Sequence, residues 1–470
     1  MFLIVYVDDF KMSGPEGHFD EAWKLIRRDS KGVGIDTDDP QPTGKFLGCT
    51  HKVFEAPANA FNDCLPAAVT GIRVMPDGEV KPQFQTKAQV LKAQLEGPEI
   101  KNPGYSTKVR YIEYDMEDFF ESCCKRYLEL APKGTTLRHV TTPFIDESVS
   151  CITDFGIPES EARTKALAQL EANQSELSNI ASKCLMKVLY GARMCRYDLL
   201  RPVCHLASQV TKWDRTCDRK LHKLMCYISS TLDIRMVGKV GDSKESLRAA
   251  IFSDADFAGC AQTMRSTSGV FAKIMGPNTH MPISGASTKQ TAVSHSTAEA
   301  EIVAAEVALR KEGLPVLDLL QVVLGNPNTP VICEFFEDNQ ATIRMLESGK
   351  NPTLRHLPRT HKVDLAWLFQ EFKKSTYDLK YCTSEEQAAD IFTKHFVNSD
   401  KWNDVMHTIG HVRMKDMWTK YKFSTPPKAK PMKVPDEGVP KVSGRPVASP
   451  RLPPLTTPDQ HVQIALSSKL

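Results

Sequence analysis

Hydrophobic and polar positions change their spacing along the chain, and these changes mark the elements that the sequence predicts. Apolar runs predict three consecutive strands at residues 247–260, 268–275 and 280–287. Beyond them, strand-like runs at 331–336 and 377–381 alternate with helical spacing at 296–312, 339–347, 360–372 and 385–394. Strands that come first and then alternate with helices predict a mixed sheet with helices on its faces, in the α/β or α+β class.

The first half of the chain predicts a hairpin followed mainly by helices. Two apolar stretches within residues 2–12 flank the acids Asp8 and Asp9, which predicts a β-hairpin. Residues 54–110 contain strand-like and loop stretches with Gly and Pro, and their pattern indicates no function. Helical spacing is found at 18–28, 114–130, 162–170, 180–194, 199–210 and 214–230.

The predicted elements divide the 470 residues into five segments, with enough length for two or three domains. The segments are a strand-rich part (1–110), a helical part (111–240), the mixed sheet (241–400), a helix (401–423) and a tail (424–470). Ten of the 30 prolines fall in the tail, together with seven Lys or Arg and three acids. This composition predicts a disordered, basic tail.

The charge of the chain is modest for a protein that binds nucleic acid. The formal net charge is +3, and the tail accounts for it, so any nucleic-acid groove must be a local basic patch. Solvated helix faces explain most of the basic residues between 193 and 223, but several are candidates for phosphate contacts. They are Arg193, Arg196, Arg201, Lys212, Arg215, Arg219, Lys220 and Lys223.

Thirteen cysteines raise the question of disulfides or bound metal. Their number is odd and none lies in a C-x-x-C pair, so we predict free, buried thiols in a reducing compartment. His407 and His411 have a spacing that fits zinc on a helix, but no third ligand lies near them in the sequence. We therefore predict a pair of surface histidines. No apolar run approaches the ~20 residues of a membrane span, so no membrane partner is expected.

Acidic residues interrupt four otherwise apolar segments. These segments lie at 252–257, 300–305, 335–340 and 388–392. A carboxylate beside buried apolar residues must be paired, hydrogen-bonded or bound to metal, because desolvating an isolated charge costs several kcal/mol. No run of Lys or Arg lies near these acids, which favours metal, and hard oxygen ligands select Mg²⁺ or Mn²⁺. Two such ions, about 4 Å apart, would form a two-metal nuclease site.

Local patterns help to choose among neighbouring acids. A capping box at 296–299 gives Glu299 a structural role and leaves Glu301 as the candidate ligand. Strand alternation puts Asp254 and Asp256 on one face of a strand, and spacing alone does not separate them.

Five motifs in this region lie at 253–259, 265–269, 296–301, 337–340 and 389–394. In order and approximate spacing they resemble the ribonuclease H domain of copia-type long-terminal-repeat retrotransposons. The resemblance implies that Asp254, Glu301, Asp338 and Asp390 are catalytic and bind two Mg²⁺ or Mn²⁺ ions. It implies that Asp254 contacts both ions, Glu301 and Asp338 one of them, and Asp390 the other. Considered without the other acids, Asp338 could instead be the N-cap of the helix that follows it, and Asp390 could be a solvated acid.

Three further residues complete the comparison with this family. Phe257 stands where the family usually has Trp, a conservative change that leaves the carboxylates untouched. Arg265, in the second motif, is a candidate for contact with nucleic acid. The loop before the last acid, 383–386, lacks the mobile His of some ribonucleases H, so we interpret His361 as a structural or phosphate-side residue.

The beginning of the chain resembles part of a reverse transcriptase. The sequence Tyr-Val-Asp-Asp ends in Asp8 and Asp9, which the resemblance implies are metal ligands of the palm. Phe46, Leu47 and Gly48 look like the hairpin that grips the primer, and the helices between 179 and 230 look like the thumb and connection. Arg193 and Lys212 are then candidates for nucleic-acid contact. The third palm carboxylate and the fingers are missing from this sequence, so we predict no polymerase activity from this chain alone.

The resemblance implies endonucleolytic hydrolysis of the RNA strand of an RNA–DNA hybrid, the 2′-hydroxyl marking the strand to be cut. Expected partners are the hybrid and the upstream polyprotein segments, namely fingers, palm and integrase. The alternative is a catalytically inactive nucleic-acid-binding remnant or a domesticated interaction protein. We expect an intracellular location, in cytoplasm or nucleus. The terminal Ser468-Lys469-Leu470 matches a peroxisomal signal, which we interpret first as a coincidence.

Overall fold

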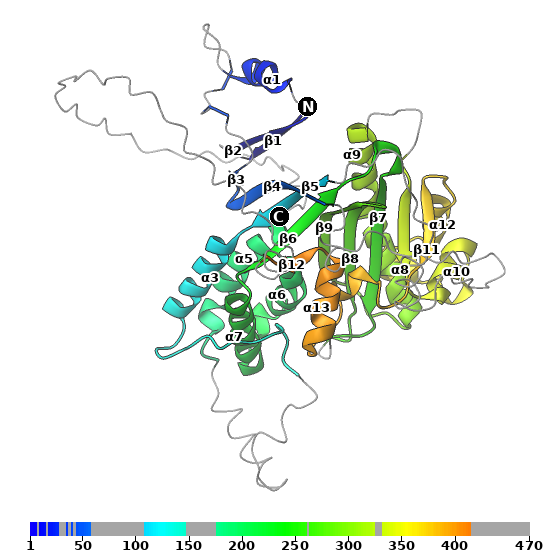
Figure 1. The fold of residues 1–470 in the computed structure, drawn as a ribbon. Coiled ribbons are helices and arrows are strands. Elements are labelled where there is room, and N and C mark those ends of the chain that lie inside the picture. Colours follow the sequence, from blue (N-terminus) through cyan, green and yellow to red (C-terminus); the bar gives the residue numbers. More distant parts are fainter. Residues whose placement is uncertain are drawn as a thin grey trace, which may run out of the picture. The chain divides into compact units, whose positions relative to one another are not determined.

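The computed structural model describes residues 1–6, 9–15, 17–27, 34–35, 39–40, 44–57, 108–146, 175–260, 263–324 and 331–414 (Figure 1). The predicted helix at 162–170, the predicted tail and the terminal tripeptide lie outside these residues. No helix in the described part of the chain has the length and apolar character needed to cross a membrane.

The chain begins with the predicted hairpin. Strand β1 (Phe2–Tyr6) pairs antiparallel with β2 (Asp9–Ser13), and Tyr6 lies opposite Asp9. Helix α1 (Phe19–Ile26) follows at the predicted place. Asp9 is exposed at the start of β2, and Asp8 lies outside the described residues.

A second hairpin lies beside the first. Strands β3 (Lys45–Phe46) and β4 (Cys49–Pro57) are joined by Leu47 and Gly48, which have φ angles of 51° and 79°. Positive φ at both positions is the geometry of a two-residue hairpin turn, in which glycine is favoured. From β2, the Lys11 ammonium lies 5.4 Å from the centroid of the Phe46 ring. The β1–β2 and β3–β4 hairpins are therefore neighbours.

Among the described residues, ten strands form one mixed sheet. Its order is β11-β10-β7-β8-β9-β6-β5-β4-β3, and β12 pairs with β6. Strand β10 is parallel to β7 and β11, whereas the other pairs are antiparallel. The remaining strands are β5 (Lys108–Asp115), β6 (Ile234–Val240), β7 (Arg248–Asp256), β8 (Thr267–Gly276), β9 (Thr279–Lys289), β10 (Cys333–Glu337), β11 (Tyr377–Tyr381) and β12 (His411–Arg413). The predicted class, a mixed sheet with flanking helices, is confirmed.

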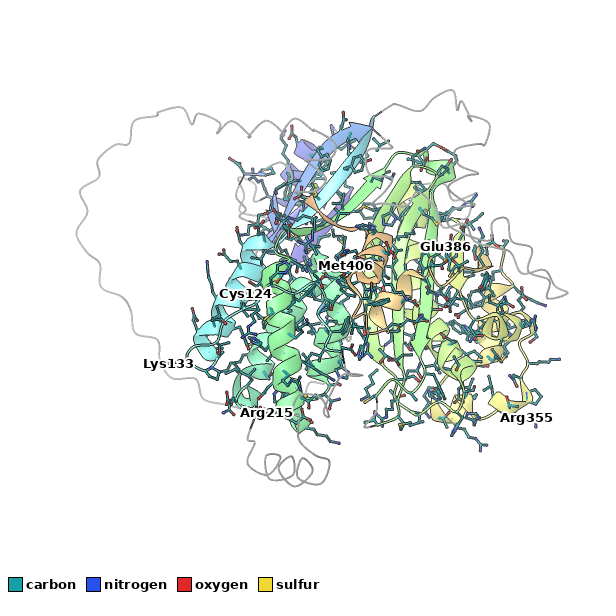
Figure 2. All side chains as sticks on the ribbon, turned by 60° about the horizontal axis from the view of Figure 1, so that its bottom comes forward. Cys124, Lys133, Arg215, Arg355, Glu386 and Met406 are labelled. Carbon is teal, nitrogen blue, oxygen red and sulfur yellow. The ribbon has the colours of Figure 1, made fainter. Side chains whose placement is uncertain are left out.

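Helices cover both faces of this sheet, each with its own apolar core. The helices that share a core with Phe252, Phe271 and Phe336 are α3 (Glu117–Leu130), α5 (Ser178–Cys195), α6 (Leu200–Ala207), α7 (Arg215–Ser230) and α13 (Ser399–Thr408). Cys124 of α3 and Met406 of α13, labelled in Figure 2, belong to this core. We call the side of the sheet that this core covers the first face.

The opposite, second face packs Ile251, Ala272 and Phe335 against another group of helices. They are α8 (Thr297–Val307), the π-helical segment η4 (Ala308–Gly313), α9 (Leu314–Leu324), α10 (Gln340–Ser348), α11 (Leu357–Thr360) and α12 (Leu365–Phe372). Successive strand residues alternate between the two faces, and because helices cover both, β7, β8 and β10 are buried along nearly their whole length.

Several predicted helices begin or end elsewhere. Tyr114 lies in β5 rather than in a helix, because it pairs with His51 and Met236 on neighbouring strands. The segment 360–372 is interrupted at Lys362, whose φ is 61°, and α12 begins only after Asp364, which caps it. The segment 385–394 contains just the 3-10 helix η6 (Ala388–Phe392). The predicted helix at 401–423 is α13, which ends at Thr408 and is followed by β12.

Two predictions about polar residues are corrected by burial. His411 is not a surface histidine: it is fully buried and accepts a hydrogen bond of 3.0 Å from the Tyr197 backbone. Arg196 and Arg201 are buried as well, so neither lies on a solvated helix face. The prediction of free thiols is confirmed for the described cysteines, all of which are unpaired and nearly all buried.

Candidate metal centre

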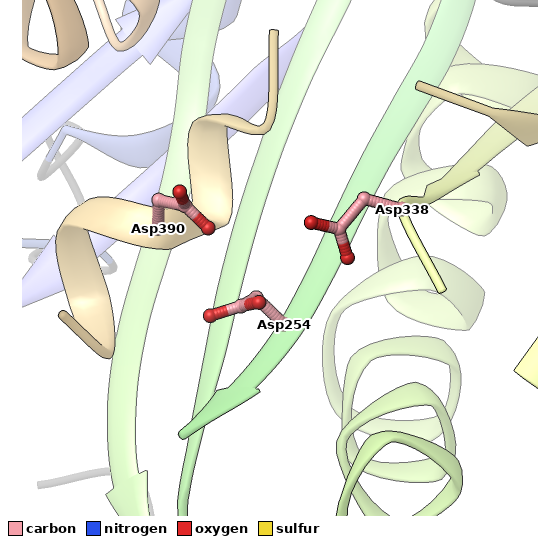
Figure 3. Close-up of side chains that lie close together, drawn as sticks. All are labelled: Asp254, Asp338 and Asp390. Atoms are coloured by element: carbon pink, nitrogen blue, oxygen red, sulfur yellow. The ribbon is translucent and has the colours of Figure 1, made fainter. Parts of the chain in front are cut away.

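Parallel pairing of β7 and β10 brings two of the predicted acids together. Phe336 lies opposite Phe252, and the same register continued by two residues sets Asp338 level with Asp254. The carboxyl ends of parallel strands lie at one edge of a sheet, where open α/β sheets usually bind ligands. Figure 3 shows the carboxylates of Asp254 and Asp338 converging there with that of Asp390.

Asp390 reaches this edge because the segment η6 packs closely on strand β8. Gly269 of β8 lies directly opposite Asp254 of β7. A Cβ atom at Gly269 would lie 2.7 Å from Thr393 Cγ2 and 2.8 Å from the Ala389 carbonyl oxygen. The absent side chain therefore provides the space in which η6 carries Asp390 to Asp254.

We expect Gly269→Ala to destabilise the protein by about 1–3 kcal/mol, because the new methyl group overpacks against backbone that cannot move freely. The same displacement of η6 should weaken Mn²⁺ binding, measured by isothermal titration calorimetry beside denaturant unfolding. Gly313→Ala is the matched control, since the atom nearest to its Cβ would be the end of the Leu309 side chain, at 3.3 Å, and the next two neighbours would lie at ordinary contact distances of 3.6 and 3.8 Å. Equal effects of the two substitutions would contradict this account of Gly269.

Two glutamates approach the same edge from the second face. Helix α8 packs Ala300 and Ala304 against Ala255 of β7, which places the next residue, Glu301, beside the sheet edge. Glu337, the last residue of β10, is fully buried. Its carboxylate accepts hydrogen bonds from Ser253 Oγ at 3.0 Å and from the Asn339 backbone at 3.2 Å.

The acids form two groups that could each hold a metal ion. The first group is Asp254, Asp338 and Asp390, and the second is Glu301, Glu337 and Asp338. Within each group the ligand oxygens all lie within 4.8 Å of one another. Asp338 belongs to both groups, whereas the sequence-based assignment gave the shared role to Asp254.

Glu301 also has an oxygen that needs a partner. Its side chain is only 3% exposed, and Oε2 has no hydrogen-bond partner among the described residues. An unsatisfied buried oxygen costs about 1–3 kcal/mol, and more if it is charged, so such atoms are rare in folded proteins. A bound cation would satisfy this oxygen.

Burial and mutual repulsion favour protonation of the acids when no cation is present. Burial raises the pKa of Asp254 to about 6, against the opposing effects of Lys394 and Thr393. Burial, and then the charge of Asp254, raise the pKa of Asp390 to about 8. Burial, Glu337 and Asp254 raise the pKa of Glu301 to about 11. A cation between these groups would reverse the effect by stabilising the carboxylates.

These pKa values predict how stability depends on pH without divalent ions. Asp254 and Asp390 bind protons in the folded protein that the unfolded chain, with an ordinary pKa of 3.8, releases. The folded state is therefore favoured at low pH, and this contribution is lost as pH rises through about 6 and 8. We expect the melting temperature in EDTA to fall between pH 5 and 9, and Mg²⁺ to restore it at the higher pH.

The control for this prediction is a variant that carries both Asp254→Asn and Asp390→Asn. It should show a smaller decrease in melting temperature between pH 5 and 9, and a smaller response to Mg²⁺. Identical pH profiles of the wild type and the double variant would contradict the assignment of these pKa shifts.

Polar residues beside the first group fix its carboxylates in place. Thr393 Oγ1 donates to Asp254 Oδ2, and Lys394 Nζ lies 2.6 Å from Asp390 Oδ1. Ser384 Oγ lies 3.4 Å from Asp338 Oδ2. The N-cap of α10 is Asn339, not Asp338, so the capping explanation for Asp338 is wrong. Asp390 is buried and is therefore not a solvated acid.

The structure separates Asp256 from Asp254. Asp256 is paired with Arg201 of α6, whose Nη2 lies 2.9 Å from Asp256 Oδ2. Its other oxygen accepts a hydrogen bond from the Thr267 backbone. Arg201 also donates to the Thr393 carbonyl at 2.9 Å, so one arginine supports both β7 and the segment after η6. Asp256 therefore serves the fold around the acids.

Glu299 has the structural role that the capping box predicted. Ser296 Oγ accepts from the Glu299 backbone at 3.2 Å, while the Glu299 carboxylate accepts from the His295 backbone at 3.0 Å. The Nε2 atoms of His356 and His361 lie 2.9 and 3.2 Å from Glu299 Oε1. His361 is buried, which supports a structural role for it.

The structure places the residues predicted to contact nucleic acid on elements other than those that carry the two acidic groups. Arg193, Lys212 and Arg265 are exposed, on α5, at the end of a 3-10 helix and just before β8. Phe46, Leu47 and Gly48 are half-buried in the β3–β4 hairpin, where Tyr190 Oη donates to the Leu47 carbonyl at 2.7 Å. Neither acidic group includes Asp9. Phe257 is 45% exposed beside the end of β7.

Sequence reasoning did not assign a role to Glu337, Thr393 or Lys394. Glu337 precedes Asp338 in the motif at 337–340, but strand alternation turns its side chain to the opposite face of the sheet from Asp338. Only the packing of α8 shows that Glu301 lies on that face as well. Lys394 is four residues after Asp390, a spacing that could have indicated their contact. No sequence signal indicated that Thr393 would donate to Asp254.

No protein-family model matches the sequence, and comparisons with curated proteins and with solved structures find no match either.

Proposed function

We propose that this chain is a metal-dependent phosphodiesterase of the ribonuclease H type, which hydrolyses the RNA strand of RNA–DNA hybrids. One observation carries the proposal: Asp254, Glu301, Asp338 and Asp390 come from four separate elements and meet at the carboxyl edge of two parallel strands. They are the four acids that the resemblance to copia-type retrotransposons marks as catalytic. Three of the four are buried, and their close approach is costly unless a cation binds them.

The order of the elements supports the same proposal. Three antiparallel strands, β7 to β9, are followed by α8, β10, α10 and then β11. This is the sequence of elements that the resemblance implies. The five motifs and the acids at the sheet edge are thus consistent with one family, that of copia-type elements.

Carboxylate oxygens favour Mg²⁺ or Mn²⁺ as the cations. Two such ions would supply an activated water and stabilise the leaving 3′ oxygen of the phosphodiester. Asp254, Asp338 and Asp390 would hold one ion, and Glu301 and Asp338 would contribute to the other. Thr393 and Lys394 would keep Asp254 and Asp390 in place, since hydrogen bonds to ligating carboxylates maintain their orientation.

The hybrid would need contacts beyond the acids. The exposed side chains of Arg193, Lys212 and Arg265 are candidates for its phosphates, and binding should then weaken as salt rises. The β3–β4 hairpin is a further candidate surface.

The test is cleavage by the purified full chain of a hybrid that carries different labels on its RNA and DNA strands. We expect Mg²⁺ or Mn²⁺ to support cutting of the RNA strand only, and EDTA to prevent it. Double-stranded DNA of the same sequence is the control substrate. Hybrid binding without cleavage under either metal, by folded protein, would reject the enzyme and favour the nucleic-acid-binding alternative.

A further inference from the structure

Glu337 lies where a ligand of the second cation would be. Its carboxylate is grouped with those of Glu301 and Asp338, all within 4.8 Å, although Asp254 is not part of this group. The alternation along β7 and β10 explains the separation. Asp254 follows Phe252 on the first face, whereas Glu337 follows Phe335 on the second face, where α8 presents Glu301.

The hydrogen bonds of Glu337 leave room for a cation. A carboxylate can accept about four hydrogen bonds, and only Ser253 and the Asn339 backbone donate to this one in the described structure. These two donors contact different oxygens and therefore hold the carboxylate in a defined orientation. Glu337 is fully buried, so bulk water does not use its remaining lone pairs.

Glu301 supplies an independent indication that something binds between these groups. Its Oε2 atom is buried and has no partner within the described part of the chain. The other members of the second group are Glu337 and Asp338, whose ionised carboxylates are acceptors like its own. An acceptor among acceptors is satisfied by a cation, and hard oxygens select a divalent ion such as Mg²⁺ or Mn²⁺.

We propose that Glu337 is a direct ligand of the second divalent cation, which binds between Glu301, Glu337 and Asp338. The site then contains five carboxylates, with Asp338 shared between the two ions and Ser253 orienting Glu337. The inference rests on the proposed function for the role of this cation in RNA cleavage. The site itself rests on the geometry of the three acids and on the unpaired oxygen of Glu301.

The test counts bound Mn²⁺ by electron paramagnetic resonance, using the full chain and its Glu337→Gln variant. The wild type should bind two ions, and Glu337→Gln should retain the ion of the first group while binding the second at least about 10-fold more weakly. Asp390→Asn should show the opposite pattern. The matched control is Glu334→Gln, another buried glutamate of β10, which pairs with Lys380 at 3.0 Å and belongs to neither group.

Two Mn²⁺ ions bound by Glu337→Gln with wild-type affinities would overturn the proposal. If that variant does not fold, Ser253→Ala decides, because it removes only the hydrogen bond that orients Glu337. A weaker second ion in Ser253→Ala supports the proposal, and unchanged binding overturns it. Hybrid cleavage is measured in parallel. If the wild type binds two ions but does not cut RNA, the proposed function is rejected and the role of Glu337 as a ligand stands. If Glu337→Gln binds both ions and cleaves normally, the role of Glu337 is rejected and the proposed function stands.

Discussion

Asp254→Asn and Asp338→Asn are each expected to reduce cleavage of the RNA strand by at least about 10³-fold. Each substitution keeps the shape of the side chain but removes a charge that would hold a cation in the proposed site. Metal ions contribute several kcal/mol to stabilisation of the transition state, and each 1.36 kcal/mol is a factor of ten in rate. The measurement is single-turnover cleavage of the labelled hybrid at saturating Mg²⁺, beside the wild type.

Two substitutions serve as controls for this loss. Asp256→Asn alters the neighbouring acid on the same strand face, which pairs with Arg201 outside both acidic groups, and should retain far more activity. Glu385→Gln alters an exposed acid close to Asp390 in the sequence and should leave the rate unchanged. Equal losses in Asp254→Asn and Asp256→Asn would show that the loss comes from disturbed folding rather than from a lost ligand.

Asp198→Asn is expected to lower the free energy of unfolding by about 3–5 kcal/mol. Arg196 is fully buried and contacts Asp198 through two hydrogen bonds, of 2.8 and 2.7 Å. Burial alone would raise the pKa of Asp198, but Arg196 holds it below its ordinary value. Removing the carboxylate leaves the guanidinium charge buried without its counter-ion. Denaturant unfolding measures the loss.

An exposed pair of the same chemistry is the control for Asp198. Arg126 and Glu129 lie 2.9 Å apart on α3, but both side chains are more than half exposed. Glu129→Gln should therefore cost less than about 1 kcal/mol. Replacing both Arg196 and Asp198 by apolar residues should recover much of the stability lost in Asp198→Asn, because no charge remains buried. A small effect of Asp198→Asn would contradict the assigned pairing.

Residues with regular spacing were predicted well where local signals agreed with packing. The strands β7 to β11 and helices α5, α7 and α10 occur where periodicity predicted them. The spacing of apolar residues indicates both the type of element and which of its faces is buried. Tyr114 shows the limit of this reasoning. It continues the helical pattern of α3, but pairing with His51 and Met236 extends the preceding strand, and these partners are distant in the sequence.

Burial of polar residues also depended on partners that the local sequence does not show. Arginine is mostly exposed and histidine is intermediate in burial, and the spacing of Arg196, Arg201 and His411 gave no reason to place them inside. Their partners are Asp198, Asp256 and the Tyr197 backbone, which come from other elements in two of the three cases. Whether a charge is solvated or paired depends on these partners, so only the folded chain decides it.

The sequence by itself determined the mixed sheet, most of its elements and four acidic segments in an apolar context, because these properties are local. The tertiary structure decided how the carboxylates are grouped at the sheet edge. The parallel register of β7 and β10 places Asp254 beside Asp338. The absence of a side chain at Gly269 leaves space for Asp390 to approach them. Strand alternation turns Glu337 toward Glu301. These choices depend on contacts between strands and helices far apart in the chain, where a shift of one residue turns every side chain to the other face.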